Sequence, residues 1–325
     1  MARRIRLPGI VDVVLVSDPA EIRVLNDAHG VDRNFVLRGP LVNRLIVARI
    51  RRWFQIMGQL LPSLMPRSDH VRADHQQKLA AVVDPASGNT LWSNSQIDAL
   101  AAYVCGGSAD EAVGIVAQQI VGSLFDPLYH ADGATWKAAK LIDQFRDGIS
   151  PIQIVWQLTG QLRRARALLV DRAKADRWTM HGTAIGVHGI VRALAQMRRL
   201  RRVPNPESLS DEAVLWQCLA PPKQVPRTVE VPLETPLVKE ALSVGSILML
   251  QLEAAWPRAP DAELVFMQGH WNACPARAFV TGLLLTVCGV GAYRSPLLHD
   301  RRDEPERYIS RRQRQQRCHL HTVEI

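Results

Sequence analysis

Segments with a helical spacing of apolar residues fill most of the chain up to Arg199, and this periodicity constrains the fold more than any other feature. They lie at 41–61, 75–83, 94–104, 110–124, 136–145, 151–172 and 178–199. A β-branched run from Ile10 to Val16 predicts a strand before them, and strands are also predicted over 225–233 and 243–252. The pattern therefore predicts a mainly α fold with a small β component.

The composition fits one soluble globular domain. Hydrophobic residues make up 47% of the 325 residues and charged residues 22%, which permits a sizeable core and argues against wholesale disorder. With no repeat or low-complexity linker, we expect a single domain over 1–298 and a basic, loosely ordered tail over 299–325. The longest apolar run, 279–293, is shorter than the ~18–20 residues of a membrane span. We expect a cytoplasmic protein, because the N-terminus lacks a clear signal cleavage site and the five cysteines form no CxxC pair.

The net charge of +9 comes largely from arginine clusters at 49–52, 198–202 and 311–314. Such clusters attract nucleic acid, anionic lipid or an acidic protein, or they are simply solvated helix faces. Because no zinc-finger or RNA-binding signature accompanies them, a nucleic-acid partner is not expected.

The segment 267–277 delivers a single cysteine, Cys274, to the start of a helix. Pro275 suits a first helical turn, and the helix that follows is apolar on nearly all sides, so it should be buried. A cysteine at such a position has backbone N–H groups and the positive end of a helix dipole beside its sulfur, which favours the thiolate. Cys274 is therefore a candidate metal ligand; the alternative is a packed structural cysteine.

Other segments, taken with this one, resemble cytochrome P450s. The run 215–228 resembles the family's stretch in which a helix ends at a pair of prolines and a strand then presents an arginine, here Arg227, to a haem propionate. The run 68–72 is similar to the acidic-His-x-Arg start of the family's C helix, with His70 and Arg72. Glycines at 182, 186 and 189 fall on one face of an ideal helix, as in the family's I helix, where the haem lies against the backbone.

The resemblance implies a single-domain P450-like architecture that carries haem b. Cys274 would be the thiolate ligand of the iron, and Arg227 and His70 would hold the propionates. The remaining residues implied to line the cofactor are Arg72, Gly182, Gly186 and Asn272.

The sequence also departs from the family. Leu215 and Cys218 stand where the family has a bracing Glu-x-x-Arg pair, and Asn272 replaces the basic residue two positions before the cysteine. The expected acid–alcohol pair of the I helix is missing, which leaves Thr183 and His188 as candidates for proton delivery. The chain is also short for the family, so the substrate cap should be reduced.

These features predict a haem-thiolate oxidoreductase that acts on a small organic molecule. The reaction would be a monooxygenation, or a peroxide-using or hydroperoxide-rearranging one. The arginine clusters would offer a docking face to an acidic, ferredoxin-like redox partner. The alternative is a catalytically degenerate P450-like scaffold or binding subunit.

Overall fold

The computed structural model describes most of the chain, and its described ranges are 2–56, 58–82, 91–146, 156, 158–174, 176–200, 215, 218–219, 221–235, 240–258, 262–267 and 269–293. The predicted tail at 299–325 and most of 204–217 lie outside the described residues. Among the residues described, no helix combines the length and apolar character needed to cross a bilayer.

The main sheet joins the beginning of the chain to a segment more than two hundred residues later. Its strands are β1 (Arg3–Leu7), β2 (Val11–Val16), β3 (Val31–Asp32), β6 (Val225–Val229) and β7 (Ile247–Leu250), in the order β1-β2-β7-β6-β3. β2 and β7 are parallel, and the other pairs are antiparallel. A separate two-stranded ladder is formed by β4 (Gln55–Ile56) and β5 (Gln59–Leu60). The predicted mainly α fold with a small β component is confirmed. Strand β1 was not predicted from the sequence.

Helices make up the rest of the described chain. They are α1 (Pro19–Asp27), α2 (Leu41–Phe54), α3 (His70–Val82), α4 (Asn94–Val104), α5 (Asp110–Ser123), α6 (Gly133–Arg146), α8 (Gln161–Arg172), α9 (Arg177–His181), α10 (Val187–Leu200), α12 (Leu252–Ala255), α13 (Ala262–Phe266) and α14 (Arg277–Tyr293). Short 3-10 turns cover Pro62–Leu64 and Trp256–Arg258, and a π-helical turn, η3, covers Gly182–Gly186.

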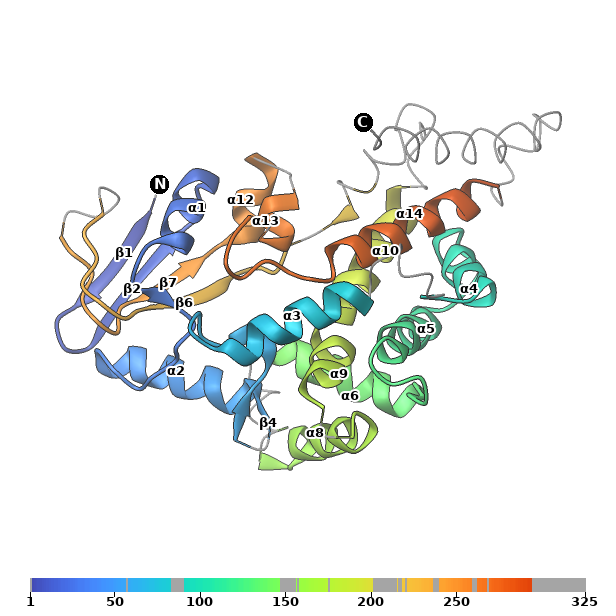
Figure 1. Ribbon diagram of the computed structural model, residues 1–325, viewed down its shortest axis with the longest axis horizontal. Helices are drawn as coiled ribbons and strands as arrows, with labels where there is room; N and C mark the ends of the chain where they lie inside the picture. Colours follow the sequence, from blue (N-terminus) through green and yellow to red (C-terminus); the bar gives the residue numbers. More distant parts are fainter. Residues whose placement is uncertain are drawn as a thin grey trace, which may run out of the picture.

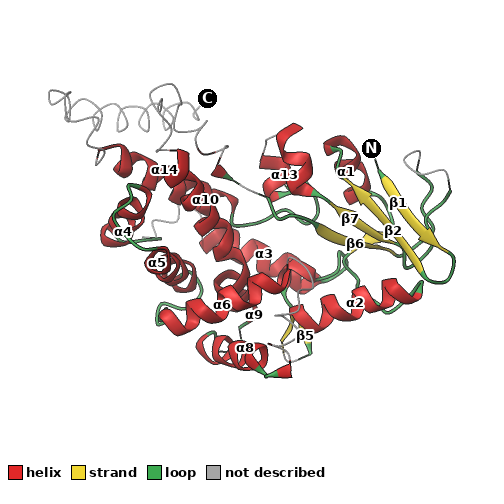
Figure 2. Ribbon diagram, turned by 180° about the vertical axis from the view of Figure 1, so that it is seen from behind, coloured by secondary structure: helices red, strands yellow, loops and turns green. Residues whose placement is uncertain are grey.

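The sheet and the helical bundle occupy opposite ends of the molecule. Figure 1 shows α1 and α2 beside the sheet, the helices α4 to α10 and α14 at the other end, and α3 between the two parts. Figure 2 gives the same arrangement from behind. The site discussed below lies where the two parts meet, because it takes residues from α1, α3, β6 and the loop before α14.

Local sequence explains several helix ends. Asp18 is the N-cap of α1 and accepts from the backbone N–H groups of Ala20 and Glu21, with Pro19 at the first helical position. Ser93 and Gln96 form a reciprocal capping box at the start of α4. These caps satisfy backbone donors that a helix start would otherwise leave without partners.

The helical core contains Leu215 and Cys218. Leu215 is 2% exposed and Cys218 is fully buried, and both pack among apolar side chains of α4, α5, α10 and α14. Burial, with a smaller effect from Cys288, raises the pKa of Cys218 to about 12, so it is a neutral thiol. These two positions therefore contribute to the core by apolar packing and not by an ion pair.

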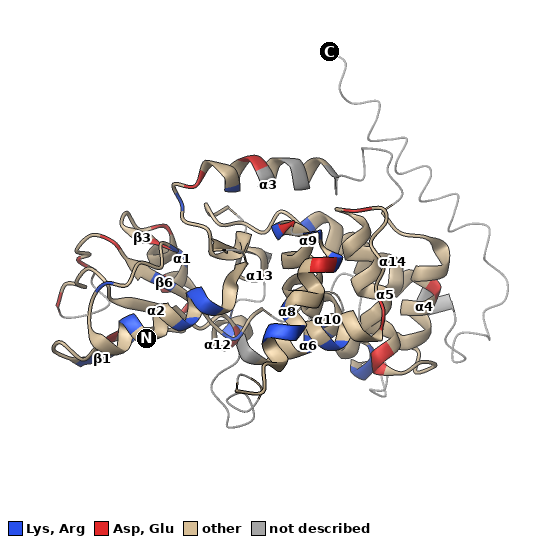
Figure 3. Cartoon of the chain, turned by 90° about the horizontal axis from the view of Figure 1, so that it is seen from below, with Lys and Arg blue, Asp and Glu red and all other residues tan. Residues whose placement is uncertain are grey.

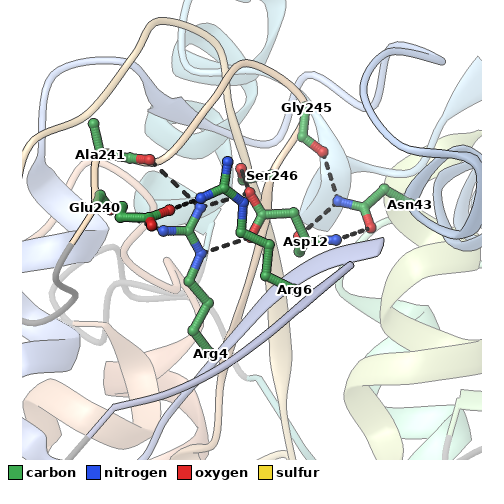
Figure 4. Close-up of polar contacts among 8 residues, drawn as sticks. All are labelled: Arg4, Arg6, Asp12, Asn43, Glu240, Ala241, Gly245 and Ser246. Carbon is green, nitrogen blue, oxygen red and sulfur yellow. Dashed lines mark hydrogen bonds and ion pairs between the residues drawn. The ribbon is translucent and has the colours of Figure 1, made fainter. Parts of the chain in front are cut away.

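A buried polar cluster fixes α2 against the sheet (Figure 4). Asn43 donates from Nδ2 to the carbonyls of Asp12 (2.7 Å) and Gly245 (2.8 Å), and its Oδ1 accepts from the Asp12 backbone N–H at 3.1 Å. The Asp12 carboxylate accepts from Arg4 and from the Ser246 hydroxyl. Burial raises the pKa of Asp12, but these hydrogen bonds and the nearby arginine charges outweigh it, so the pKa lies below its ordinary value.

We predict that Asn43→Ala lowers the free energy of unfolding by about 3 kcal/mol or more, because it leaves one N–H and two carbonyl groups buried without partners. The melting temperature should fall by roughly 5–10 °C. Asn94→Ala is the control, because Asn94 is exposed on α4 and its loss should change the free energy by less than about 0.5 kcal/mol. Equal melting temperatures for the two variants would show that the cluster does not hold α2.

Candidate functional site

Backbone hydrogen bonds close the loop that carries Cys274. The Cys274 N–H donates to the carbonyl of Phe266 at 2.6 Å, and the Ala273 N–H donates to that of His270 at 3.0 Å. The loop reverses through left-handed φ angles of 51° at Met267 and 80° at Gly269. Helix α14 begins at Arg277, so the predicted delivery of this cysteine to a helix start is confirmed.

The electrostatic surroundings of Cys274 differ from the expectation. Its thiol is accessible to solvent, yet burial raises its pKa, and the Ala276 N–H and the charges of Arg33 and Arg72 only partly offset this. The predicted lowering of the thiol pKa is therefore wrong for the protein alone, because desolvation exceeds the effect of the helix start. A bound metal cation would reverse the balance, since a coordinating thiol loses its proton outright.

Four arginines surround the Trp271 ring next to this cysteine. Their guanidinium carbons lie 5.0 Å (Arg72), 5.7 Å (Arg33), 5.7 Å (Arg67) and 5.8 Å (Arg227) from the ring centroid. The indole N–H donates to the Asn26 carbonyl at 2.9 Å, so Trp271 supports the arginines and does not hydrogen-bond the sulfur. A cation over an indole face gains only about 1–2 kcal/mol, which does not offset the burial of several charges.

Three of these arginines, Arg33, Arg72 and Arg227, are buried, and we call them the arginine cluster. They are 7%, 5% and 0% exposed, and none forms an ion pair with a carboxylate of the described residues. Burial and mutual repulsion lower the pKa of Arg227 to about 9, and that of Arg33 falls in the same direction. The Nε atoms of Arg33 and Arg72 have no hydrogen-bond partner among the described residues. Buried cations with unused donors are costly unless an anion joins them.

Neutral amides, not carboxylates, position Arg227 in the cluster. Its Nε and Nη2 donate to Asn26 Oδ1 at 3.0 and 2.8 Å. When the Asn272 amide is oriented so that its oxygen faces donors, this oxygen accepts from Arg227 at 2.6 Å and from Arg33 at 3.2 Å. The amides orient the guanidinium groups, and the nearby carboxylate of Asp32 offsets their charge only in part.

Helix α3 contacts the cysteine loop with one face only. Arg72 donates to the Met65 carbonyl, and Gln76, one turn later, donates to the Ala273 carbonyl at 2.9 Å. His70 is exposed, and it precedes Arg72 by two residues, which is about 200° around the helix. His70 therefore does not join the buried arginines, and its role at a propionate stays a prediction, whereas Arg72, Arg227 and Asn272 lie together.

A π turn, Gly182–Gly186, lies within the glycine-containing α9–α10 segment, and the surroundings of the three glycines differ. A Cβ on Gly182 would lie 2.9 Å from Val121 and 3.0 Å from Phe125, so this glycine allows close packing against α5. A Cβ on Gly186 would meet only the His181 carbonyl at 3.8 Å, and one on Gly189 would meet nothing within 4 Å. Gly182 is thus a packing residue, and Gly186 keeps an open face.

Thr183 and His188 both form contacts within the helical bundle. The Thr183 hydroxyl donates to the Thr179 carbonyl at 2.7 Å and is fully buried. The His188 ring stacks on Trp136, and its Nε2 lies 3.1 Å from the Ala139 carbonyl of α6. Their role in proton delivery stays a prediction.

His181, which the sequence patterns did not single out, does face the arginine cluster. Burial and the charges of Arg33 and Arg72 lower its pKa to about 4, and its Nδ1 has no partner among the described residues. The same two arginines act on Cys274, so this imidazole and that thiol share one electrostatic environment. In the sequence, the only indication of a role for His181 is its position beside Gly182, the first of the three glycines. No motif in the sequence indicates a role for Arg33.

Comparison with known proteins agrees with this geometry. No family model and no curated protein matches the chain. Among solved structures, a six-coordinated cytochrome P450 from Thermus thermophilus is similar at 17% identity and a TM-score of 0.61, with 90% of this chain and 86% of that chain covered. CYP154C4 from Streptomyces sp. ATCC 11861 is similar at 16% identity and a TM-score of 0.59, with 90% of this chain and 84% of that chain covered. Cytochrome P450 OleT in complex with arachidonic acid is similar at 10% identity and a TM-score of 0.59, with 88% of this chain and 82% of that chain covered. The chain therefore has a cytochrome P450-like fold.

The residues present fit a haem. Among the described residues, no three His, Cys, Asp or Glu side chains gather to hold a metal ion, so Cys274 suits a metal that brings its other ligands with it. Two carboxylates on the same group would supply the anionic partners that the arginine cluster lacks. Gly186 leaves space for a flat ring beside the backbone.

We predict that His181 makes stability fall with acidification. Its folded pKa of about 4 lies below the ordinary 6.5, so between these values the unfolded chain binds a proton that the folded chain does not. As the pH falls from 6.5 to 4, the free energy of unfolding of the unchanged protein should decrease by about 2–3 kcal/mol more than that of the His181→Asn variant. Urea titrations at several pH values measure this loss, with His29→Asn, an exposed position, as control. If the free energy of unfolding changes with pH in the same way in all three proteins, the prediction is contradicted.

Proposed function

We propose that this chain binds haem b, with the Cys274 thiolate as iron ligand, and acts as an oxidoreductase on a small organic molecule. The observation that carries the proposal is the arginine cluster, a buried set of cations without ion-pair partners in the described chain, close enough to Cys274 to act on its pKa. The P450-like fold supports the proposal, because the resemblance of the sequence to that family assigns haem contacts to Cys274 and Arg227.

Each residue has a defined task in this proposal. Arg33, Arg72 and Arg227 hold the two propionates, and the guanidinium forks favour bidentate contact with them. The Ala276 N–H donates to the sulfur of Cys274 and stabilises its thiolate form. When bound, a thiolate-ligated haem supplies oxidative chemistry and favours O–O cleavage.

His181 takes the place of the missing acid–alcohol pair. Its imidazole is neutral at pH 7, and its Nδ1 can accept a proton from the O–H of a hydroperoxide and return it. Thr183 and His188 are engaged elsewhere, so the residues favour a peroxide-using reaction over a dioxygen-using one. Structural neighbours are described with myristic acid and arachidonic acid, which makes long-chain acids reasonable first substrates to test.

The second candidate is a P450-like scaffold without turnover. Leu215 and Cys218, in place of the bracing ion pair, favour it, because they hold the fold by apolar packing alone. An acidic redox partner would be needed only if dioxygen is the oxidant, so its requirement also separates the two oxidant classes.

The first test is the absorption spectrum of the purified protein, reduced and exposed to carbon monoxide. We expect a red-shifted thiolate-type Soret band that disappears in Cys274→Ala and persists in Cys105→Ala, which removes an exposed cysteine at the end of α4. A folded protein that takes up no haem, even when haem is supplied, would leave the scaffold as the better interpretation.

The second test compares the contributions of Arg72 and His70 to haem affinity. Arg72→Gln should weaken haem binding by about 10-fold to 100-fold, the effect of losing a charge-assisted hydrogen bond at a buried site. His70→Gln should leave the affinity unchanged, because His70 is exposed. Haem titration followed at the Soret band measures both. A loss in His70→Gln alone would restore the sequence-based assignment.

A further inference from the structure

Residues 33–68 contain seven arginines and no aspartate, glutamate or lysine. Two of them, Arg33 at the site above and Arg51, which donates to the Phe35 carbonyl, are directed into the protein. Helix α2 (Leu41–Phe54) lies at the centre of this stretch and carries four arginines. Such a run produces one sign of charge over a continuous surface.

Helix α2 has the largely apolar inward face of an ordinary surface helix, but it also exposes aliphatic side chains to solvent. One face packs inward with Asn43, Val47 and Trp53. The outward stripe contains Leu41, Arg44, Leu45, Ala48 and Arg52, all exposed. Leu41 is 51% and Leu45 is 62% exposed, so aliphatic side chains lie on the solvent side among arginines. A helix with arginines and exposed leucines on one side is typical of an interfacial helix.

The turn between β1 and β2 extends this apolar stripe. The N–H groups of Leu41 and Val42 donate to the carbonyls of Gly9 (3.1 Å) and Ile10 (2.8 Å), so the turn and the start of α2 are joined. Figures 1 and 2 both show the turn and this end of α2 together at the outer edge of the molecule. We call the exposed aliphatic residues of this region the apolar corner; they are Leu7 (55%), Ile10 (50%), Leu37 (54%), Leu41 and Leu45.

The charges around the apolar corner are basic. Arg38, Arg44 and Arg52 form no ion pair with any of the described residues, while Arg6 pairs with Glu240. Figure 3 shows blue segments on α2 and no red ones. The apolar corner is therefore bordered by cations that remain available to an anionic surface.

We propose that the apolar corner and the arginines of α2 dock this protein on the surface of an anionic lipid bilayer. The aliphatic side chains would enter the headgroup region, and Arg44 and Arg52 would contact lipid phosphates. A two-fold contact between copies of the chain would place like charges against each other, which disfavours a dimer. Nucleic-acid sites combine arginine with aromatic stacking groups, whereas this corner is aliphatic. The proposal does not depend on haem binding.

The test is co-sedimentation of the full-length protein with vesicles of phosphatidylcholine alone, or of phosphatidylcholine and phosphatidylglycerol in equal parts. We expect binding to the anionic vesicles that weakens with salt, and much weaker binding to the neutral ones. Leu41→Gln/Leu45→Gln should reduce the partition coefficient by more than about tenfold. Arg44→Gln/Arg52→Gln should reduce it by roughly fivefold for each arginine.

Leu128→Gln is the matched control, because Leu128 is 81% exposed on a loop away from α2 and its loss should leave binding unchanged. Melting temperatures and light-scattering masses of all variants establish that they fold and remain monomeric. Three results would overturn the proposal: no binding to either vesicle, binding indifferent to the leucine pair, or a dimer in solution that the leucine pair dissociates. Capture by an acidic peptide in place of vesicles would assign the face to a protein partner.

Discussion

Three guanidinium groups share a buried space around one indole ring, and the described chain provides no carboxylate to pair with them. The amide oxygens of Asn26 and Asn272 orient these groups, but amides do not cancel charge. The three arginines come from three different parts of the chain. Arg72 lies on α3, Arg227 on β6 and Arg33 in the segment after β3. Burial, with a smaller effect from the neighbouring arginine charges, lowers the pKa values of both His181 and Arg227. An anionic partner is what would make this arrangement stable.

The rest of the architecture keeps these elements in register. The main sheet pairs the first strands of the chain with β6 and β7, so Arg227 and Asn26 come together from opposite ends of the sequence. The Asn43 cluster attaches α2 beneath the same sheet through backbone groups. In the helical bundle, Leu215 and Cys218 contribute apolar packing to the core. A fold that lacks one polar brace can persist when the surrounding core is well packed.

A π turn at Gly182–Gly186 joins α9 to α10. Gly182 packs close to Val121 and Phe125, and His181, just before the turn, is near enough to Arg33 and Arg72 for their charges to lower its pKa. The Thr183 backbone carbonyl accepts from Gln118 of α5, and His188 Nε2 lies 3.1 Å from the Ala139 carbonyl of α6. Sequence spacing cannot show a single residue inserted into the helical repeat, since glycine-rich helical segments accept α and π geometry alike.

The sequence by itself determined the helical class, the small sheet, the cysteine before a buried helix and the arginine that follows paired prolines. These features depend on periodicity and on contacts within a few residues, which can be read from the sequence. The tertiary structure decided that Arg33 and His181 lie close enough to Arg72 to feel its charge, that Thr183 and His188 form contacts within the helical bundle, and that the thiol pKa is raised. Those outcomes depend on helix rotation, on desolvation and on long-range charge, and all three arise only when distant segments pack together.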